Sequence, residues 1–308
     1  FANFDLREWS NFRVHTQLAQ TCWAHAGLVQ LERFLMDIRK ESIARAGVSL
    51  DFFLLVFIRD RLENLRSLDT FRYSPNSSDL FYLAMKYGVV TRENMPVSEG
   101  AIEERFDDAI NLIAKVWNSE QIASKRGEHL KKRIFYELGT MFGPRVVDLF
   151  FSSMNKYKDL AFDFAESIRE QEIILIELFE GGYEKARVPL ERFWEEASPE
   201  RRMMSMSRID QLSIMKMILD RGGRATLHVN WQEDEIDRMN QKKVISSLGV
   251  NSASLPLVGH GVYIIDHNQF GIVVVNSHGP SFGIKGFAFL SYDYVLRNLQ
   301  GLHFIIRK

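Results

Sequence analysis

Hydrophobic residues recur every three or four positions in three stretches of the first hundred residues, which is the period of one face of an α-helix. This pattern predicts a helix from Cys22 to about Lys40, a second from about Leu50 to Leu68, and a third from Asp79 to Tyr87 that ends at Gly88. Residues 1–21 lack such a period and are expected to be irregular. The first part of the chain is therefore expected to be helical.

The pattern stays helical through the middle of the chain, where charged residues become frequent. Breaks are expected at Gly143-Pro144, Gly181-Gly182 and Pro199. The apolar faces of these helices are expected at Leu160, Phe164, Ile168, Leu175, Leu178 and Phe179. The sequence therefore predicts a long helical segment, which we delimit at residues 101–205.

After Gly222-Gly223 the period shortens towards two, and short runs of β-branched and aromatic residues alternate with Gly, Asn and Ser. Five strands are predicted, at residues 225–231, 261–265, 271–275, 287–290 and 303–306. Runs of helices followed by runs of strands indicate an α+β protein, in which two lobes could meet at a cleft.

Composition narrows the class of protein. The chain has 308 residues, of which 46% are hydrophobic and 26% charged, so it can bury a large core without disulfides or metals. The 39 basic and 40 acidic residues give a net charge of −1, which provides no electrostatic reason to expect nucleic acid or anionic lipid as a partner. The longest apolar run, Phe52 to Ile58, is too short to span a bilayer. A soluble globular protein is expected.

The sequence contains little information about cofactors or about the cellular compartment. Spacings typical of metal ligands, such as His-Glu-x-x-His or paired Cys-x-x-Cys, do not occur, and neither does a phosphate-binding glycine loop, so we expect no metal and no cofactor. The chain opens at Phe1 without an initiator Met or a signal-like segment. Two localisations stay open, cytoplasmic or, if an N-terminal signal was removed, periplasmic or secreted.

The single cysteine, Cys22, stands at the predicted start of the first helix. A helix N-terminus carries partial positive charge and unpaired N–H groups, which bias a thiol towards thiolate and offer donors to an oxyanion. A lone cysteine is more often a small buried hydrophobe, so this feature needs support from elsewhere.

That support lies near the other end of the chain. His260 stands between two glycines at the head of a predicted strand, and Asn276 follows the next strand. If the two strands pair as a hairpin around residues 267–269, His260 and Asn276 lie side by side. The amide could then hold the imidazole while its other nitrogen faces a thiol. Cys22, His260 and Asn276 together predict a nucleophilic site.

The stretch Gln17 to Ala26, taken with the His260 and Asn276 segments, resembles papain-like cysteine peptidases, and most closely their bleomycin hydrolase/aminopeptidase C branch. Residues 83–96 and 286–295 are similar to further segments of that branch. The resemblance touches roughly half of the chain and implies a papain-like fold of one catalytic domain, residues 1–308. Its expected parts are a mainly helical lobe (1–100) with the nucleophile helix, a helical insertion (101–205) and a β-barrel-like lobe (206–308) with His260 and Asn276.

The resemblance also implies the chemistry. The chain would be a cysteine peptidase, and more narrowly an aminopeptidase, that hydrolyses peptide or protein substrates through a thioester. Cys22 would be the nucleophile, His260 the base and then the acid, and Asn276 the group that orients His260. The Cys22 N–H and a glutamine would bind the oxyanion. Thr16 stands where the family has this glutamine, so Gln17 is favoured over Gln20. A homo-oligomer is common in this branch.

Several departures from the family qualify these expectations. His278 replaces a tryptophan that shields the His–Asn bond, so the bond is expected to be exposed to water and weakened. Ser74-Pro75 replaces a Gly-Gly pair that binds the substrate backbone, and proline offers no N–H. A tail that limits cleavage to the substrate N-terminus is not evident before Lys308. Trp23 and His278 are expected to neighbour the site.

Other interpretations stay open. His25, one turn after Cys22, is expected to be a packed histidine rather than a second catalytic imidazole. The altered Ser74-Pro75 region is compatible with a different acyl transfer, such as deamidation or transamidation of a protein side chain. The departures at His278 and Ser74-Pro75 are also compatible with a degenerate papain fold that only binds a partner.

Overall fold

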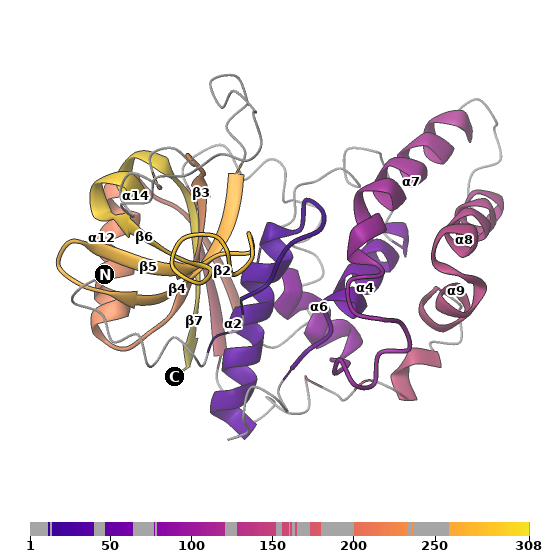
Figure 1. Ribbon diagram of the computed structural model, residues 1–308, viewed down its shortest axis with the longest axis horizontal. Helices are drawn as coiled ribbons and strands as arrows, with labels where there is room; N and C mark the ends of the chain where they lie inside the picture. Colours follow the sequence, from indigo (N-terminus) through magenta and orange to yellow (C-terminus); the bar gives the residue numbers. More distant parts are fainter. Residues whose placement is uncertain are drawn as a thin grey trace.

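The computed structural model of the chain describes residues 12, 14–39, 47–63, 77, 79–120, 128–151, 156–159, 161, 164, 173–179, 200–232, 236 and 259–307. Figure 1 shows helices gathered at one end of the molecule and a sheet at the other. Helix α2 (Cys22–Arg39) lies between them and contacts strands on one side and helices on the other. The chain is therefore an α+β protein with a helical and a strand-rich lobe, as the sequence predicts.

The helical lobe contains the three helices expected from the first hundred residues. These are α2, α4 (Leu50–Glu63) and α6 (Asp79–Tyr87). Helix α6 ends at Gly88, whose φ of +79° favours glycine. The middle of the chain adds η1 (Glu103–Arg105), α7 (Phe106–Glu120), α8 (Glu128–Phe142), α9 (Pro144–Phe150) and η2 (Lys156–Asp159).

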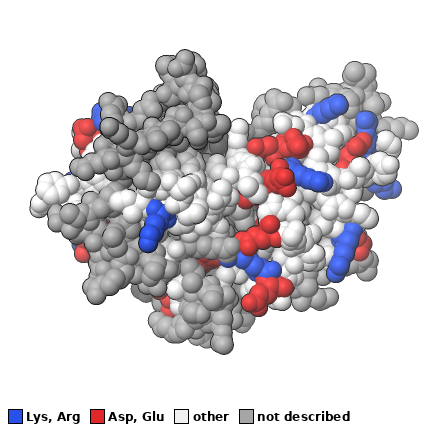
Figure 2. All heavy atoms as spheres, viewed as in Figure 1, with Lys and Arg blue, Asp and Glu red and all other residues white. Residues whose placement is uncertain are grey.

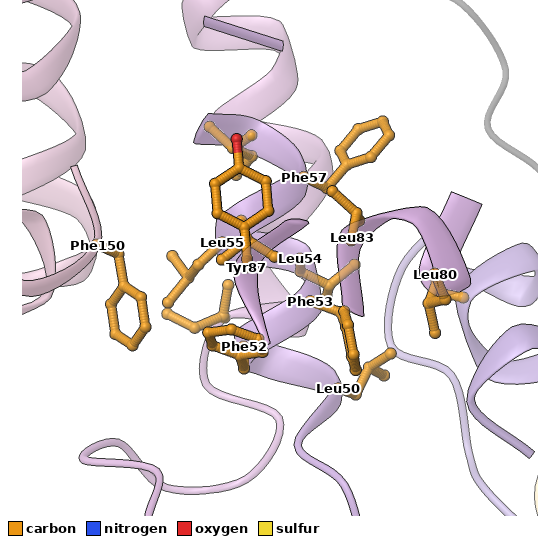
Figure 3. Close-up of a cluster of buried hydrophobic side chains, with 14 of the residues drawn as sticks. Leu50, Phe52, Phe53, Leu54, Leu55, Phe57, Leu80, Leu83, Tyr87 and Phe150 are labelled. Atoms are coloured by element: carbon orange, nitrogen blue, oxygen red, sulfur yellow. The ribbon is translucent and has the colours of Figure 1, made fainter. Parts of the chain in front are cut away.

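Helix α4 forms the centre of this lobe. Every residue from Leu50 to Leu62 is buried, as expected for a helix that is apolar on nearly all sides. Figure 3 shows side chains of α6 and Phe150 of α9 gathered around it. Asp60 is buried in the same helix, where it accepts hydrogen bonds from Lys86 Nζ at 2.6 Å and Tyr87 OH at 3.0 Å. A buried carboxylate needs such partners to offset its loss of hydration.

Over the described residues, the strand-rich lobe forms one seven-stranded sheet in the order β2-β1-β7-β3-β4-β5-β6. Neighbouring strands are antiparallel except β1 and β2, which are parallel. The five strands predicted from the sequence are β3 (Ala225–Asn230), β4 (Gly259–His267), β5 (Gly271–Val275), β6 (Phe287–Ser291) and β7 (Leu299–Arg307). The other two are β1 (Ile173–Phe179) and β2 (Glu200–Ser205).

The alternation of side chains along the strands gives the sheet two buried faces. Val262 and Ile264 of β4 pack on the side of α12 (Arg208–Asp220) and α14 (Tyr292–Asn298). Tyr263 points to the opposite side and packs with Val29 of α2. Because both faces are covered, all five residues of β5 are buried. The sheet is thus fixed directly against the helix that begins at Cys22.

The expected helical character of residues 101–205 is wrong in two places. Residues 173–179 and 200–205 are strands of the sheet. The spacing of Leu175, Leu178 and Phe179 was compatible with a helix face, but the run from Ile173 pairs with β2 on one side and β7 on the other. A short apolar run can be a buried strand or part of a helix, and periodicity alone does not separate the two.

The surface carries both acidic and basic side chains. Over the described part of the face in Figure 2, acidic and basic side chains lie interspersed. Within the described ranges, none of the helices combines the length and the apolar character needed to cross a lipid bilayer.

Candidate active site

The start of α2 brings Cys22 against the sheet. Gly261 of β4 makes this approach possible, because a Cβ atom there would lie 3.1 Å from Trp23 Cα and 3.2 Å from Cys22 O. The thiol donates to the backbone carbonyl of Gly259, with 4.0 Å between sulfur and oxygen. Residues on both sides of His260 therefore contact the Cys22 segment.

The thiol is not acidified by its helix position alone. Burial raises the pKa of Cys22, and hydrogen bonds from the backbone N–H groups of Gly261, Trp23 and Cys22 itself oppose the rise without cancelling it. The expected bias towards thiolate is therefore wrong for the resting protein, because loss of hydration outweighs the helix terminus. Cys22 is a neutral thiol at neutral pH in this structure.

His260 and Asn276 lie side by side, as the predicted hairpin requires. Strands β4 and β5 pair antiparallel, and His260 Nε2 is 2.7 Å from Asn276 Oδ1. The Ser277 N–H also donates to Asn276 Oδ1, at 2.7 Å, so this atom is an acceptor. His260 Nε2 must then carry the hydrogen of the neutral ring, which leaves Nδ1 as the proton acceptor.

Aromatic rings cover the His260–Asn276 bond. The centre of the Trp231 ring lies 4.7 Å from the centre of the His260 ring, and the centre of the His278 ring lies 4.7 Å from it as well. Phe282 packs edge-on against His278 at 5.3 Å. His260 is only 6% and Asn276 only 2% exposed. The expectation that His278 exposes the bond to water is therefore wrong, because Trp231 from another part of the chain supplies the missing indole.

The covered ring resists protonation. Burial lowers the pKa of His260 to about 3, with a further lowering from the neighbouring His278, while the hydrogen bond to Asn276 acts in the opposite direction. Burial also lowers the pKa of His278. At neutral pH both partners of the candidate pair, the Cys22 thiol and the His260 imidazole, are uncharged.

The segment before Cys22 is held by the segment after Asn276. Thr16 forms an antiparallel bridge with His278, and Gln17 N donates to Ser277 O at 2.7 Å. The Gln17 amide accepts from Ser277 Oγ at 2.5 Å and donates to Ala19 O at 3.1 Å. Gln20 is exposed, and its N–H donates to Asp107 instead. Of the two candidate glutamines, Gln17 is thus the one that lies beside Asn276.

The remaining sequence candidates lie next to the site rather than in it. The Trp23 side chain is buried in the helical core, 5.1 Å from the ring of Phe57. His25 is buried as expected, with Nε2 2.7 Å from Glu103 Oε1. Ser74-Pro75 lies outside the described residues. Sequence reasoning missed Trp231 and Glu103, since each approaches the site only through long-range packing and neither has a spacing that signals it.

The Cys22 thiol lies against the strand that bears His260. Within the described ranges, no hydrogen bond joins Cys22 to His260, because the thiol donates to Gly259 O. The site thus offers a nucleophile at a helix start, a base with one fixed tautomer and backbone N–H groups around the sulfur. This set can serve acyl transfer, in which a thiol attacks a carbonyl and loses its proton to an imidazole.

Gly261→Ala is expected to damage this site. The new methyl group would press on backbone atoms of Cys22 and Trp23, so α2 and β4 must separate by a few tenths of an ångström. We expect the free energy of unfolding to fall by about 1–3 kcal/mol and the rate of acyl transfer at this site to fall about tenfold. Gly259→Ala is the matched control, because its methyl group meets only the movable end of Gln300. Equal losses in the two variants would contradict the packing argument.

Stability is expected to depend on pH through His260 and, with opposite sign, Asp51. Between pH 6.5 and about 3 the unfolded chain protonates His260 while the folded chain does not, so folding loses about 1.4 kcal/mol per pH unit. Burial raises the pKa of Asp51 to about 6 from an ordinary 3.8, so between these values the folded chain takes up a proton and gains stability as pH falls.

The contributions of His260 and Asp51 oppose each other between pH 6 and 4, and single variants separate them. His260→Gln should become more stable relative to wild type as pH falls through this window, and Asp51→Asn less stable. Denaturant unfolding at a series of pH values measures both. A His260→Gln difference that does not change with pH would mean that His260 titrates normally.

Among the residues the structure describes, no group of three or more His, Cys, Asp or Glu side chains is arranged to hold a metal ion. No protein-family description and no curated protein matches the chain.

The fold is similar to that of many solved structures, including the following three. PepW from Lactobacillus rhamnosis HN001 is 10% identical with a TM-score of 0.47, over 96% of this chain and 80% of that one. The clostridial cysteine protease Cwp84 is 11% identical with a TM-score of 0.44, over 99% of this chain and 58% of that one. SERA5E from Plasmodium falciparum is 11% identical with a TM-score of 0.41, over 96% of this chain and 91% of that one.

Proposed function

We propose that the chain is a papain-like cysteine peptidase that hydrolyses peptide bonds of peptide or protein substrates through a thioester. The observation that carries the proposal is the His260 Nε2–Asn276 Oδ1 hydrogen bond, on a strand packed against the start of the Cys22 helix. A base with a defined tautomer beside the only cysteine of the chain suits nucleophilic catalysis.

In the proposed reaction, Cys22 Sγ attacks the scissile carbonyl while its proton passes to His260 Nδ1. Charge on the carbonyl oxygen is stabilised by the Cys22 N–H and the Gln17 amide. His260 then protonates the leaving amine as the C–N bond breaks, which leaves a thioester on Cys22. Water gives its proton to His260, attacks the thioester and releases the acid and the thiol. Because both groups start neutral, the proton moves during attack, which avoids a buried ion pair in the resting site.

A peptide library tests this function. The protein is incubated with peptides that have free or acetylated N-termini, and the products are identified by mass spectrometry. New peptide termini support the peptidase, and cleavage restricted to free N-termini supports the narrower aminopeptidase assignment. The control is protein alkylated at Cys22 with iodoacetamide, which is specific because the chain has one cysteine.

Two other results would replace the proposal. A mass gain of about one dalton on glutamine-containing substrates, without cleavage, would identify side-chain deamidation. Binding of peptides without any covalent change would identify a catalytically degenerate binding module, which the raised pKa of Cys22 and the lowered pKa of His260 make a specific alternative.

A further inference from the structure

A small pocket lies beside Asn276. It is lined by buried residues from the segment before α2, from α2, β4 and the end of β5, and from the segment after β5: His15, His25, Ala26, Val29, Gly261, Val275, Asn276 and Ser277. The pocket offers about 10 Å³ to the centre of a water-sized sphere. One water molecule needs about 10–15 Å³ by this measure.

Two of the side chains that line this pocket come from different parts of the chain, and each has a polar atom that needs a hydrogen-bond partner. Asn276 Nδ2 and His25 Nδ1 are both buried, and neither has a hydrogen-bond partner among the described residues. The other end of each side chain is satisfied, since Asn276 Oδ1 accepts from His260 and Ser277, and His25 Nε2 bonds to Glu103. Buried polar groups in folded proteins are nearly always paired with protein or ordered water.

We propose that one water molecule occupies this pocket and joins His25 to Asn276, so that the Glu103–His25 pair positions the Asn276 amide and, through it, the ring of His260. Water both donates and accepts, so it can accept from Asn276 Nδ2 and serve His25 Nδ1 in either protonation state of that ring. This inference rests on the proposed function of His260.

The Glu103 end of this network is firmly held. Glu103 Oε1 accepts from His25 Nε2, from the Thr21 hydroxyl and from Leu18 N, and the Glu103 N–H donates to Asp51 of α4 at 3.1 Å. Burial alone would raise the pKa of Glu103, but these hydrogen bonds together keep it below its ordinary value, so the group stays a carboxylate. A fixed carboxylate orients the His25 ring in turn.

The consequence for His260 follows from the geometry of an amide. Without a bond at Nδ2, only Oδ1 holds the Asn276 amide, and its plane can tilt about the last side-chain torsion. A tilt moves the acceptor away from His260 Nε2 and thus turns the imidazole. His25 is a positioning residue in this scheme, since it does not touch the reacting atoms.

Two substitutions separate positioning from packing. His25→Gln can still donate to Glu103 but has no polar atom at the δ position, so it loses the contact to the water. His25→Asn keeps a polar atom at that position and loses the contact to Glu103 instead. We expect His25→Gln to lower kcat about 3- to 10-fold with KM unchanged, the effect of one neutral hydrogen bond. His25→Asn is expected to be less impaired than His25→Gln, because it keeps the contact to the water although Glu103 no longer orients the side chain.

A second readout does not depend on peptide hydrolysis. The rate of Cys22 alkylation by iodoacetamide is measured against pH by intact mass, and every event reports on Cys22. Because a displaced imidazole takes the thiol proton less readily, we expect alkylation near neutral pH to be about 3- to 10-fold slower in His25→Gln than in wild type, the effect of one neutral hydrogen bond, and to be less affected in His25→Asn. If wild type cleaves no peptide, this profile still decides the inference, so the failure of the proposed function is distinguishable.

The inference is overturned if His25→Gln matches wild type in both measurements, or if the two variants are equally impaired. A crystal structure of the wild type provides a test that needs no variant. It is expected to show one solvent peak within hydrogen-bonding distance of both Asn276 Nδ2 and His25 Nδ1, and a pocket without such a peak would also overturn the proposal.

Discussion

Cys22→Ala is expected to lower kcat/KM for peptide hydrolysis by about 10⁴-fold or more, because no other group of the site can form the thioester. The side chain is only partly exposed, and its hydrogen bond to Gly259 O is long, so the variant should unfold at nearly the same temperature as wild type. Activity is measured on the best peptide from the library, and folding by circular dichroism.

Cys22→Ser is the matched control, since it keeps a hydroxyl in the place of the thiol. A serine hydroxyl is a much weaker acid than a thiol, and a neutral His260 with a lowered pKa is a poor base for it. We therefore expect hydrolysis to be lost in this variant too. Turnover at the wild-type rate in Cys22→Ala would exclude Cys22 as the nucleophile.

His260→Gln is expected to lower kcat/KM by about 10²- to 10⁴-fold, the usual contribution of a general acid–base. Glutamine is neutral, can still donate to Asn276 Oδ1 and fits beneath Trp231, so the change removes the proton acceptor with little disturbance of the hairpin. The effect should fall on kcat rather than on KM.

The double variant Cys22→Ala with His260→Gln sharpens this test. If the two residues act as one unit, the double variant loses no more activity than Cys22→Ala alone. Losses that add in free energy would mean that His260 contributes independently of the thiol, for example by binding substrate, and the proposed proton transfer would then be wrong.

Much of this architecture could be predicted from the sequence, because the informative patterns are local. Helix α6 and its end at Gly88 follow from a 3.6-residue period and a left-handed glycine, and the β4–β5 hairpin follows from two short runs of β-branched and aromatic residues around Asn268. Asn268 Oδ1 accepts from the N–H groups of Phe270 and Gly271, a local turn interaction that asparagine favours. The adjacency of His260 and Asn276 came from the same hairpin.

The features that could not be predicted depend on contacts between distant segments. The run at Ile173 became strand β1 because β2 and β7 were available on either side of it. Trp231 covers His260 because β3 pairs with β4, and the indole then takes the place that local reasoning assigned to His278. The direction of the Cys22 pKa shift likewise depends on how deeply α2 is buried, which its sequence does not state.

Helix α2 belongs to two hydrophobic cores at once. Leu28, Leu31 and Leu35 pack into the helical lobe, while Val29 packs under Tyr263 and Val273 of the sheet. Neither lobe can lose its structure without exposing part of this helix, so melting of one removes support from the other. The two halves of the molecule are therefore energetically coupled, and a hinge that lets them swing apart as rigid bodies would have to lie elsewhere than between Cys22 and the strand that bears His260.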